Sequence, residues 1–148
     1  MFLTIEDYKA VVDDKTLDVI NQSDETNLAR AERYAIDEIK SYLRAAEPAK
    51  TGIRKYDVDA AFQKTEQERN QQLVMYACDI ALYHLISWLP QKIGFEIREI
   101  RYNRALDWLK SVQEGKILLD IPLVPDDTTD NTAGSIRWGS ITKNTYDW

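Results

Sequence analysis

The side chains best suited to chemistry in this sequence lie close together, between residues 78 and 84. Cys78 carries a thiol, Asp79 carries a carboxylate, and His84 is the only histidine in the chain. A nucleophilic or acid–base mechanism would place such groups in an accessible polar niche, where a base can reach the nucleophile. All three instead fall in a strongly apolar stretch with helical periodicity. We therefore interpret Cys78 and His84 as buried core or interface residues.

Asp79 needs a partner if its helix is buried. An unpaired carboxylate in an apolar environment is costly, so it has to be paired with a cation or neutralised. Arg98 and Arg101 come within its reach if the following helix packs antiparallel. We predict that Asp79 forms an ion pair with these arginines that fixes the bundle. The alternative is a small enzyme with an acid–base pair around Asp79 and His84.

Other chemical patterns in the sequence are weak. Arg98, Arg101 and Arg104 recur at three-residue steps, but acidic residues are interspersed with them, which favours a solvated face of mixed charge over a strip that faces DNA. Asp57 and Asp59 lack the further oxygen ligands and the glycine of a calcium-binding loop. The sequence also lacks phosphate-binding glycine loops and His/Cys clusters. We predict no catalytic residue, no metal site and no cofactor, and hence a protein that is not an enzyme.

The charge distribution narrows the choice of partners. The formal net charge is −6, and acidic residues dominate both ends of the chain around a nearly neutral body. A dedicated nucleic-acid binder would show a basic stripe or face.

Cys78 is the single cysteine, so no internal disulfide forms and folding in a reducing cytoplasm is expected. The start of the chain lacks the features of a signal peptide, and no apolar run is long enough to span a bilayer, so we expect no membrane partner.

Helical periodicity accounts for most of the chain and defines the elements that position these side chains. Two short helices are predicted near Thr4 and from Asp14 to Asn21, and three longer ones at about 24–44, 66–89 and 95–114. The second long helix is apolar nearly all round, so it is either central in a bundle or shared between subunits. Residues 45–65 are read as a surface connection. The predicted fold class is therefore mainly α, a small helical bundle.

The sequence divides into a helical domain, residues 1–120, and an extended acidic and aromatic tail, residues 121–148. Apolar residues in the tail need a docking surface on the same chain or on another one: Ile136, Trp138, Ile141, Tyr146 and Trp148. A second set of aromatic residues is predicted at the core or at an inter-subunit face of the long helices: Tyr76, Tyr83, Trp88 and Trp108.

The order of these features resembles a known family. A helix that ends in Ile-Lys-Ser-Tyr-Leu-Arg at residues 39–44 is followed by an apolar helix at 73–89. The pattern Tyr-x-x-Ala-Leu-x-Trp-Leu-x-x-Val-x-x-Gly-Lys then runs from Tyr102 to Lys116. Over about residues 1–120 this resembles the Mu-like prophage family of small virion proteins. That family is similar to the head–tail connector proteins (head-completion or adaptor proteins) of tailed phages.

The resemblance implies a mechanical function without catalysis or cofactor. About a dozen copies would form a ring under the portal protein in the virion neck, assembled in the bacterial host cytoplasm. The ring would extend a DNA channel without binding DNA specifically, and would dock a stopper or tail-terminator protein. The tail would reach a neighbouring subunit or the portal. The polar segment 45–65 departs from the family pattern. The residues alone leave open an alternative, a cytoplasmic helical adaptor or regulatory protein that binds one protein partner.

Overall fold

The computed structural model describes residues 2–21, 25–46, 55–87 and 94–125. Within these residues the chain forms six α-helices and one short 3-10 helix: α1 (Ile5–Lys9), α2 (Asp14–Asn21), α3 (Glu25–Arg44), α4 (Val58–Gln63), η2 (Glu66–Glu68), α5 (Gln71–Ser87) and α6 (Phe95–Gln113). The prediction of a mainly helical bundle is confirmed.

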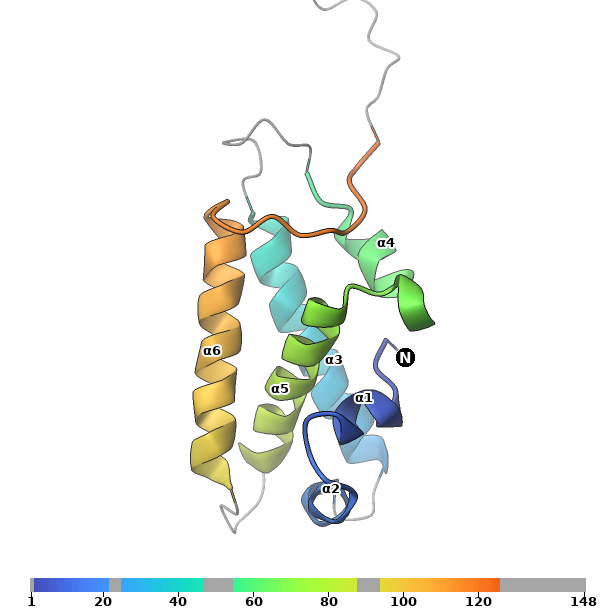
Figure 1. The fold of residues 1–148 in the computed structure, drawn as a ribbon, viewed down its shortest axis with the longest axis vertical. Helices are drawn as coiled ribbons and strands as arrows, with labels where there is room; N and C mark the ends of the chain where they lie inside the picture. Colours follow the sequence, from blue (N-terminus) through green and yellow to red (C-terminus); the bar gives the residue numbers. More distant parts are fainter. Residues whose placement is uncertain (1, 22–24, 47–54, 88–93, 126–148) are drawn as a thin grey trace, which may run out of the picture.

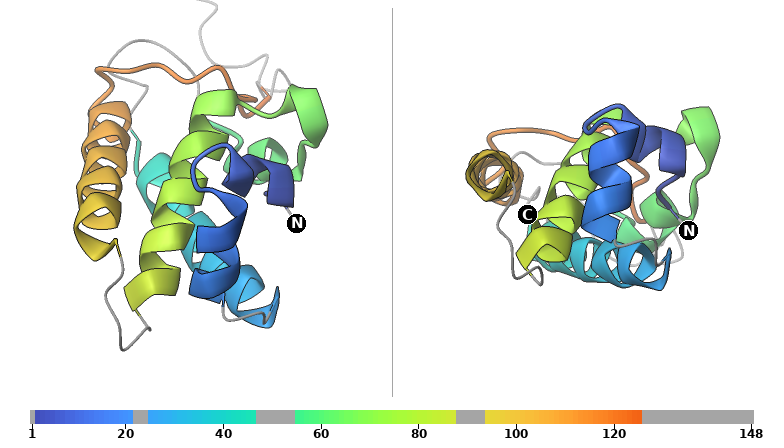
Figure 2. Two further views of the ribbon diagram at one scale, coloured as in Figure 1. Left: turned by 60° about the horizontal axis from the view of Figure 1, so that its bottom comes forward. Right: turned by 90° about the horizontal axis from the view of Figure 1, so that it is seen from below.

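Helix α5 is the centre of the bundle. Figure 1 shows α6 on one side of α5 and the α1–α2 pair on the other, with α3 behind. The end-on view of Figure 2 shows the same order. Neighbours therefore cover α5 on several faces, and side chains all around it are buried: Leu73, Val74, Tyr76, Ala77, Cys78, Ile80, Ala81, Leu82, Leu85 and Ile86. The sequence left open whether this helix is central in the bundle or shared between subunits. The structure places it at the centre of the bundle.

The start of α5 differs from the prediction, which began this helix at Glu66. The chain forms the separate turn η2 and then leaves helical geometry at Arg69, where φ is −72° and ψ is 141°. The side chain of Asn70 caps the new helix, because its Oδ1 accepts a hydrogen bond from the Leu73 N–H at 3.0 Å. The break is imposed by tertiary contacts of Arg69, described below, that no local pattern reveals.

Helix α4 was not predicted, and the interpretation of residues 45–65 as a surface connection is wrong for its later part. Tyr56, Val58 and Ala61 are buried. The Asp57 carboxylate caps α4 by accepting a hydrogen bond from the Ala60 N–H at 3.0 Å. Tyr56 forms an antiparallel bridge with Leu123, and its hydroxyl accepts a hydrogen bond from the Leu119 N–H. The segment that follows α6 is thus bound to the start of α4, a contact between distant parts of the sequence.

Candidate functional site

The carboxylate singled out on α5 is paired with α6. Asp79 is buried, and its Oδ1 accepts a hydrogen bond from Nε of Arg101 at 2.6 Å. The second predicted partner, Arg98, is also buried, but its guanidinium donates to the backbone carbonyl of Val11 at 3.4 Å. Burial, followed by the neighbouring charge of Arg101, lowers the pKa of Arg98 from its ordinary value. The two arginines join α6 to α5 and to the loop between α1 and α2.

His84 lies in a half-buried aromatic cluster on the other side of α5. Its Nε2 is 2.8 Å from Oε2 of Glu38, whose Oε1 accepts a hydrogen bond from the Tyr102 hydroxyl at 2.8 Å. Tyr102 stacks on Tyr83 with a ring-centroid distance of 4.0 Å. Burial raises the pKa of Glu38, but the hydrogen bonds from His84 and Tyr102 lower it overall below the ordinary value. The cluster holds α3, α5 and α6 together at one level of the bundle.

Asp79 and His84 therefore do not form an acid–base pair with each other. Each has its own partner on a different helix, Arg101 on α6 and Glu38 on α3. Cys78 is fully buried, and burial, with added repulsion from nearby carboxylates, raises the pKa of its thiol. A raised thiol pKa disfavours the nucleophilic thiolate. Among the described residues no three His, Cys, Asp or Glu side chains are placed to hold a metal ion.

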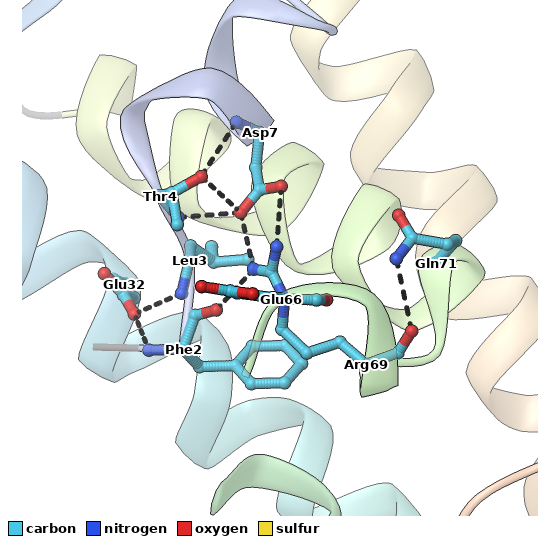
Figure 3. Close-up of polar contacts among 8 residues, drawn as sticks. All are labelled: Phe2, Leu3, Thr4, Asp7, Glu32, Glu66, Arg69 and Gln71. Atoms are coloured by element: carbon cyan, nitrogen blue, oxygen red, sulfur yellow. Dashed lines mark hydrogen bonds and ion pairs between the residues drawn. The ribbon is translucent and has the colours of Figure 1, made fainter. Parts of the chain in front are cut away.

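A polar cluster around Arg69, shown in Figure 3, was not predicted from the sequence. Arg69 donates to both oxygens of Asp7, at 2.6 and 3.1 Å, and to the backbone carbonyl of Phe2 at 2.7 Å. Its Nε donates to the carbonyl of Glu66. Both charged side chains are largely buried, with 7% of Arg69 and 14% of Asp7 exposed. Burial opposes the charge on Asp7, yet the hydrogen bonds from Arg69 and Thr4 lower its pKa overall.

Glu32 completes this cluster from α3. Its Oε1 accepts hydrogen bonds from the backbone N–H groups of Phe2 and Leu3, at 2.9 and 3.0 Å, as Figure 3 shows. Its Oε2 is buried without a hydrogen-bond partner among the described residues. One signal in the sequence could have found Glu32. It lies four residues after Leu28 and three before Ala35, inside the buried stripe of α3. A charged residue within an apolar stripe requires a polar partner.

The predicted aromatic residues fall into three groups. Tyr76 and Trp108 are buried in the core of the single chain, with ring centroids 4.6 Å apart. Tyr83 is half-buried in the cluster around His84. Trp88 and the five tail residues, Ile136, Trp138, Ile141, Tyr146 and Trp148, lie outside the described residues.

Two of the hollows on the described surface differ in charge. One, of about 500 Å³, lies among α1, α2 and the start of α3 and includes Asp14 and Asp18. The other, of about 490 Å³, lies between α3 and α4 and includes Arg33, Lys40 and Lys64.

None of the helices in the described part of the chain has the length and apolar character that a membrane span requires. The polar clusters lie between elements of the chain and join them. The hollows are among the surfaces open to a partner.

Comparison with known proteins supplies the remaining observation. Residues 3–137 match the model of the family described as Bacteriophage Mu, Gp36. Searches of curated proteins and of solved structures returned no match. The family match covers all six described helices and most of the chain, and it confirms the Mu-like phage family expected from the sequence. The chain therefore belongs to the Bacteriophage Mu, Gp36 family, and its role lies in the structure or assembly of a phage particle.

Proposed function

We propose that the chain is a head–tail connector, an adaptor or head-completion protein that forms a ring under the portal of a phage head. The match to a Mu-like phage family over residues 3–137 carries this proposal. In the virion neck the ring would extend the DNA channel and dock a stopper or tail-terminator protein. The chain itself would perform no catalysis.

The properties of the helical body support a mechanical role. The formal net charge of −6 repels DNA, so the genome would pass along the ring without being bound. The ion pair of Asp79 with Arg101 and the contacts of Arg69 with Asp7 join separate segments of the chain. Exposed isoleucines at Ile97 and Ile100 leave apolar surface for contacts with other chains. A rigid body with partner surfaces suits a connector.

Removal of the protein from a phage tests the proposal. We expect DNA-filled heads and complete tails that remain separate, because a connector joins the two after each has been made. Electron microscopy of the lysate would reveal this, and adding the purified chain should restore joined particles. A lysate that lacks a tail component serves as the control that the chain cannot rescue. Heads without DNA, or absent tails, would contradict the proposal. Exclusion from particles, with a discrete complex to one other protein, would favour the adaptor alternative.

The tail gives a second prediction. Trp138→Ala and Trp148→Ala should weaken assembly while leaving the melting temperature of the isolated chain nearly unchanged, because aromatic anchors often dominate interfaces. We expect each to reduce incorporation into particles by about tenfold, which corresponds to a loss of about 1.4 kcal/mol of binding free energy. Quantitative immunoblotting of purified particles measures this.

Trp108→Ala is the matched control for the tail variants. Trp108 is buried against Tyr76, so its removal should lower the melting temperature. If Trp138→Ala lowers the melting temperature as much as Trp108→Ala does, the tail docks on its own chain, and the assembly role of Trp138 is refuted.

A further inference from the structure

The hollow among α1, α2 and α3 is lined by both apolar and charged side chains. Ile5 of α1, Leu17 of α2 and Leu28 of α3 contribute its apolar surface. Asp14, Asp18 and Lys9 also line it, and all three are exposed, so the charged lining is net negative. Leu17 and Asp18 follow Asp14 by three and four residues, so the three side chains share one face of α2. The hollow therefore combines an apolar surface with negative charge.

Two polar groups at this hollow lack partners in the described part of the chain. Asp14 pairs with Lys9 at 3.4 Å, but Asp18 takes part in no ion pair there. The Oδ1 of Asn21, one turn further along the same face, is buried and accepts no hydrogen bond from the described residues. Unpaired acceptors favour a donor that arrives from outside. A ligand that fits this hollow would bring apolar side chains together with a cationic hydrogen-bond donor.

Helix α6 presents such a combination. Ile97 and Ile100 are 57% and 67% exposed. Arg104 is also exposed and takes part in no ion pair in the described part of the chain. These residues occupy positions i, i+3 and i+7, so they form one stripe on the helix surface. The stripe is separate from the buried face of α6, which carries Ala105 and Leu109.

The hollow and the stripe lie on different sides of the molecule. Figures 1 and 2 show α6 on one side of α5, and α1 and α2 on the other. We propose that the α6 stripe of one copy, Ile97, Ile100 and Arg104, binds in the α1–α2 hollow of a second copy, with Arg104 facing Asp18. This inference rests on the proposed function, since it assigns the subunit contact of the ring. Two different surfaces meet in this contact, so it is heterologous and can propagate from copy to copy until a ring closes.

The negative charge of the hollow favours the α6 stripe of a second copy over other possible occupants. The chain's own tail is acidic, with Asp126, Asp127, Asp130 and Asp147 against Arg137 and Lys143, so it would be repelled by Asp18. A symmetric contact between the α6 stripes of two copies would place the two Arg104 side chains close together, and their like charges would repel. The contact between stripe and hollow instead joins opposite charges and covers the exposed isoleucines, and complementary charge of this kind fixes the register of an interface.

Charge reversal of the full-length chain tests the contact. Asp18→Arg and Arg104→Asp should each weaken self-association by about tenfold to a hundredfold, because each places like charges in contact. Sedimentation velocity over a concentration series measures the change. The double variant, with both substitutions in one chain, should regain wild-type association because the pair is restored with opposite polarity. Asp37→Arg and Arg33→Asp are matched controls on the exposed surface of α3 and should leave association unchanged.

A mixture of the two single variants distinguishes this contact from a symmetric one. The Asp18→Arg chain keeps an intact stripe, and the Arg104→Asp chain keeps an intact hollow. Mixed together, they should regain association in assemblies in which the two variants alternate. The intact stripe of one binds the intact hollow of the other, and the two reversed surfaces also carry opposite charges. A symmetric α6 contact would leave Asp18→Arg without effect and would overturn the inference.

Other outcomes also decide the question. A wild-type chain that stays monomeric up to its solubility limit, or assemblies equally insensitive to both reversals, would refute the contact. The wild-type chain could assemble and join heads to tails in the phage lysate while neither charge reversal changes self-association. In that case the connector role stands, and the stripe and the hollow are the wrong surfaces. If the lysate experiment itself fails, the connector role is refuted independently of these variants.

Discussion

Arg69→Met is expected to lower the free energy of unfolding by about 3–5 kcal/mol, the usual cost of removing one partner of a buried ion pair. Methionine replaces only the aliphatic stem of arginine, so the contact of the guanidinium with the Phe2 ring is lost as well. The loss arises because Asp7 keeps a buried charge without its guanidinium partner and the Phe2 carbonyl loses its donor. Urea unfolding followed by tryptophan fluorescence measures the change.

Two controls connect that loss to the buried pair. Arg44→Met removes an ion pair with Asp59 in which both side chains are 60% exposed, so the change should stay within about 0.5 kcal/mol. Asp7→Asn removes the unpaired charge and should make Arg69→Met less costly in the double variant than the sum of the two single effects. Equal losses for Arg69→Met and Arg44→Met would mean that the cluster in Figure 3 does not hold the N-terminal segment.

Leu82→Ala should destabilise the isolated chain by about 2–5 kcal/mol, because it leaves a cavity at a fully buried site in the central helix. Helix α5 is covered by α3, α6 and the N-terminal helices of the same chain, so the effect should be independent of protein concentration. Thermal unfolding at two concentrations a hundredfold apart measures this.

Met75→Ala is the control for Leu82→Ala. Met75 lies on the same helix but is exposed, so its truncation should cost well under 1 kcal/mol. If Leu82→Ala weakened self-association while leaving the stability of the monomer unchanged, α5 would be shared between subunits. That result would contradict the central position described above.

Elements whose signals are local could be predicted from the sequence. The buried stripe of α3 and its end at Arg44 follow from apolar steps of three and four residues and from Pro48. Helix α6 begins after Gly94, which adopts a φ of 68°, and ends close to Gly115. The pairing of Asp79 with Arg101 was also accessible, because a lone acid on an apolar helix demands a cation.

Elements that depend on distant contacts could not be predicted. Arg69 ends the turn before α5, and its guanidinium donates a hydrogen bond to Asp7, which is 62 residues away in the sequence. Tyr56 is buried because Leu119 and Leu123, which follow α6, return to it. Neither contact leaves a periodic pattern, since each requires the helices to be packed first. The hollow that includes Asp18 likewise exists only after α1, α2 and α3 have met.

The buried thiol of Cys78 gives the folded chain a chemical signature. Because its side chain is inaccessible in the middle of α5, a maleimide probe can label it only after the bundle opens. The labelling rate would therefore report local opening of this one subunit inside an intact phage particle, where melting curves are dominated by other proteins. For the same reason, a cysteine introduced on the surface could carry a fluorophore without competition from the native thiol.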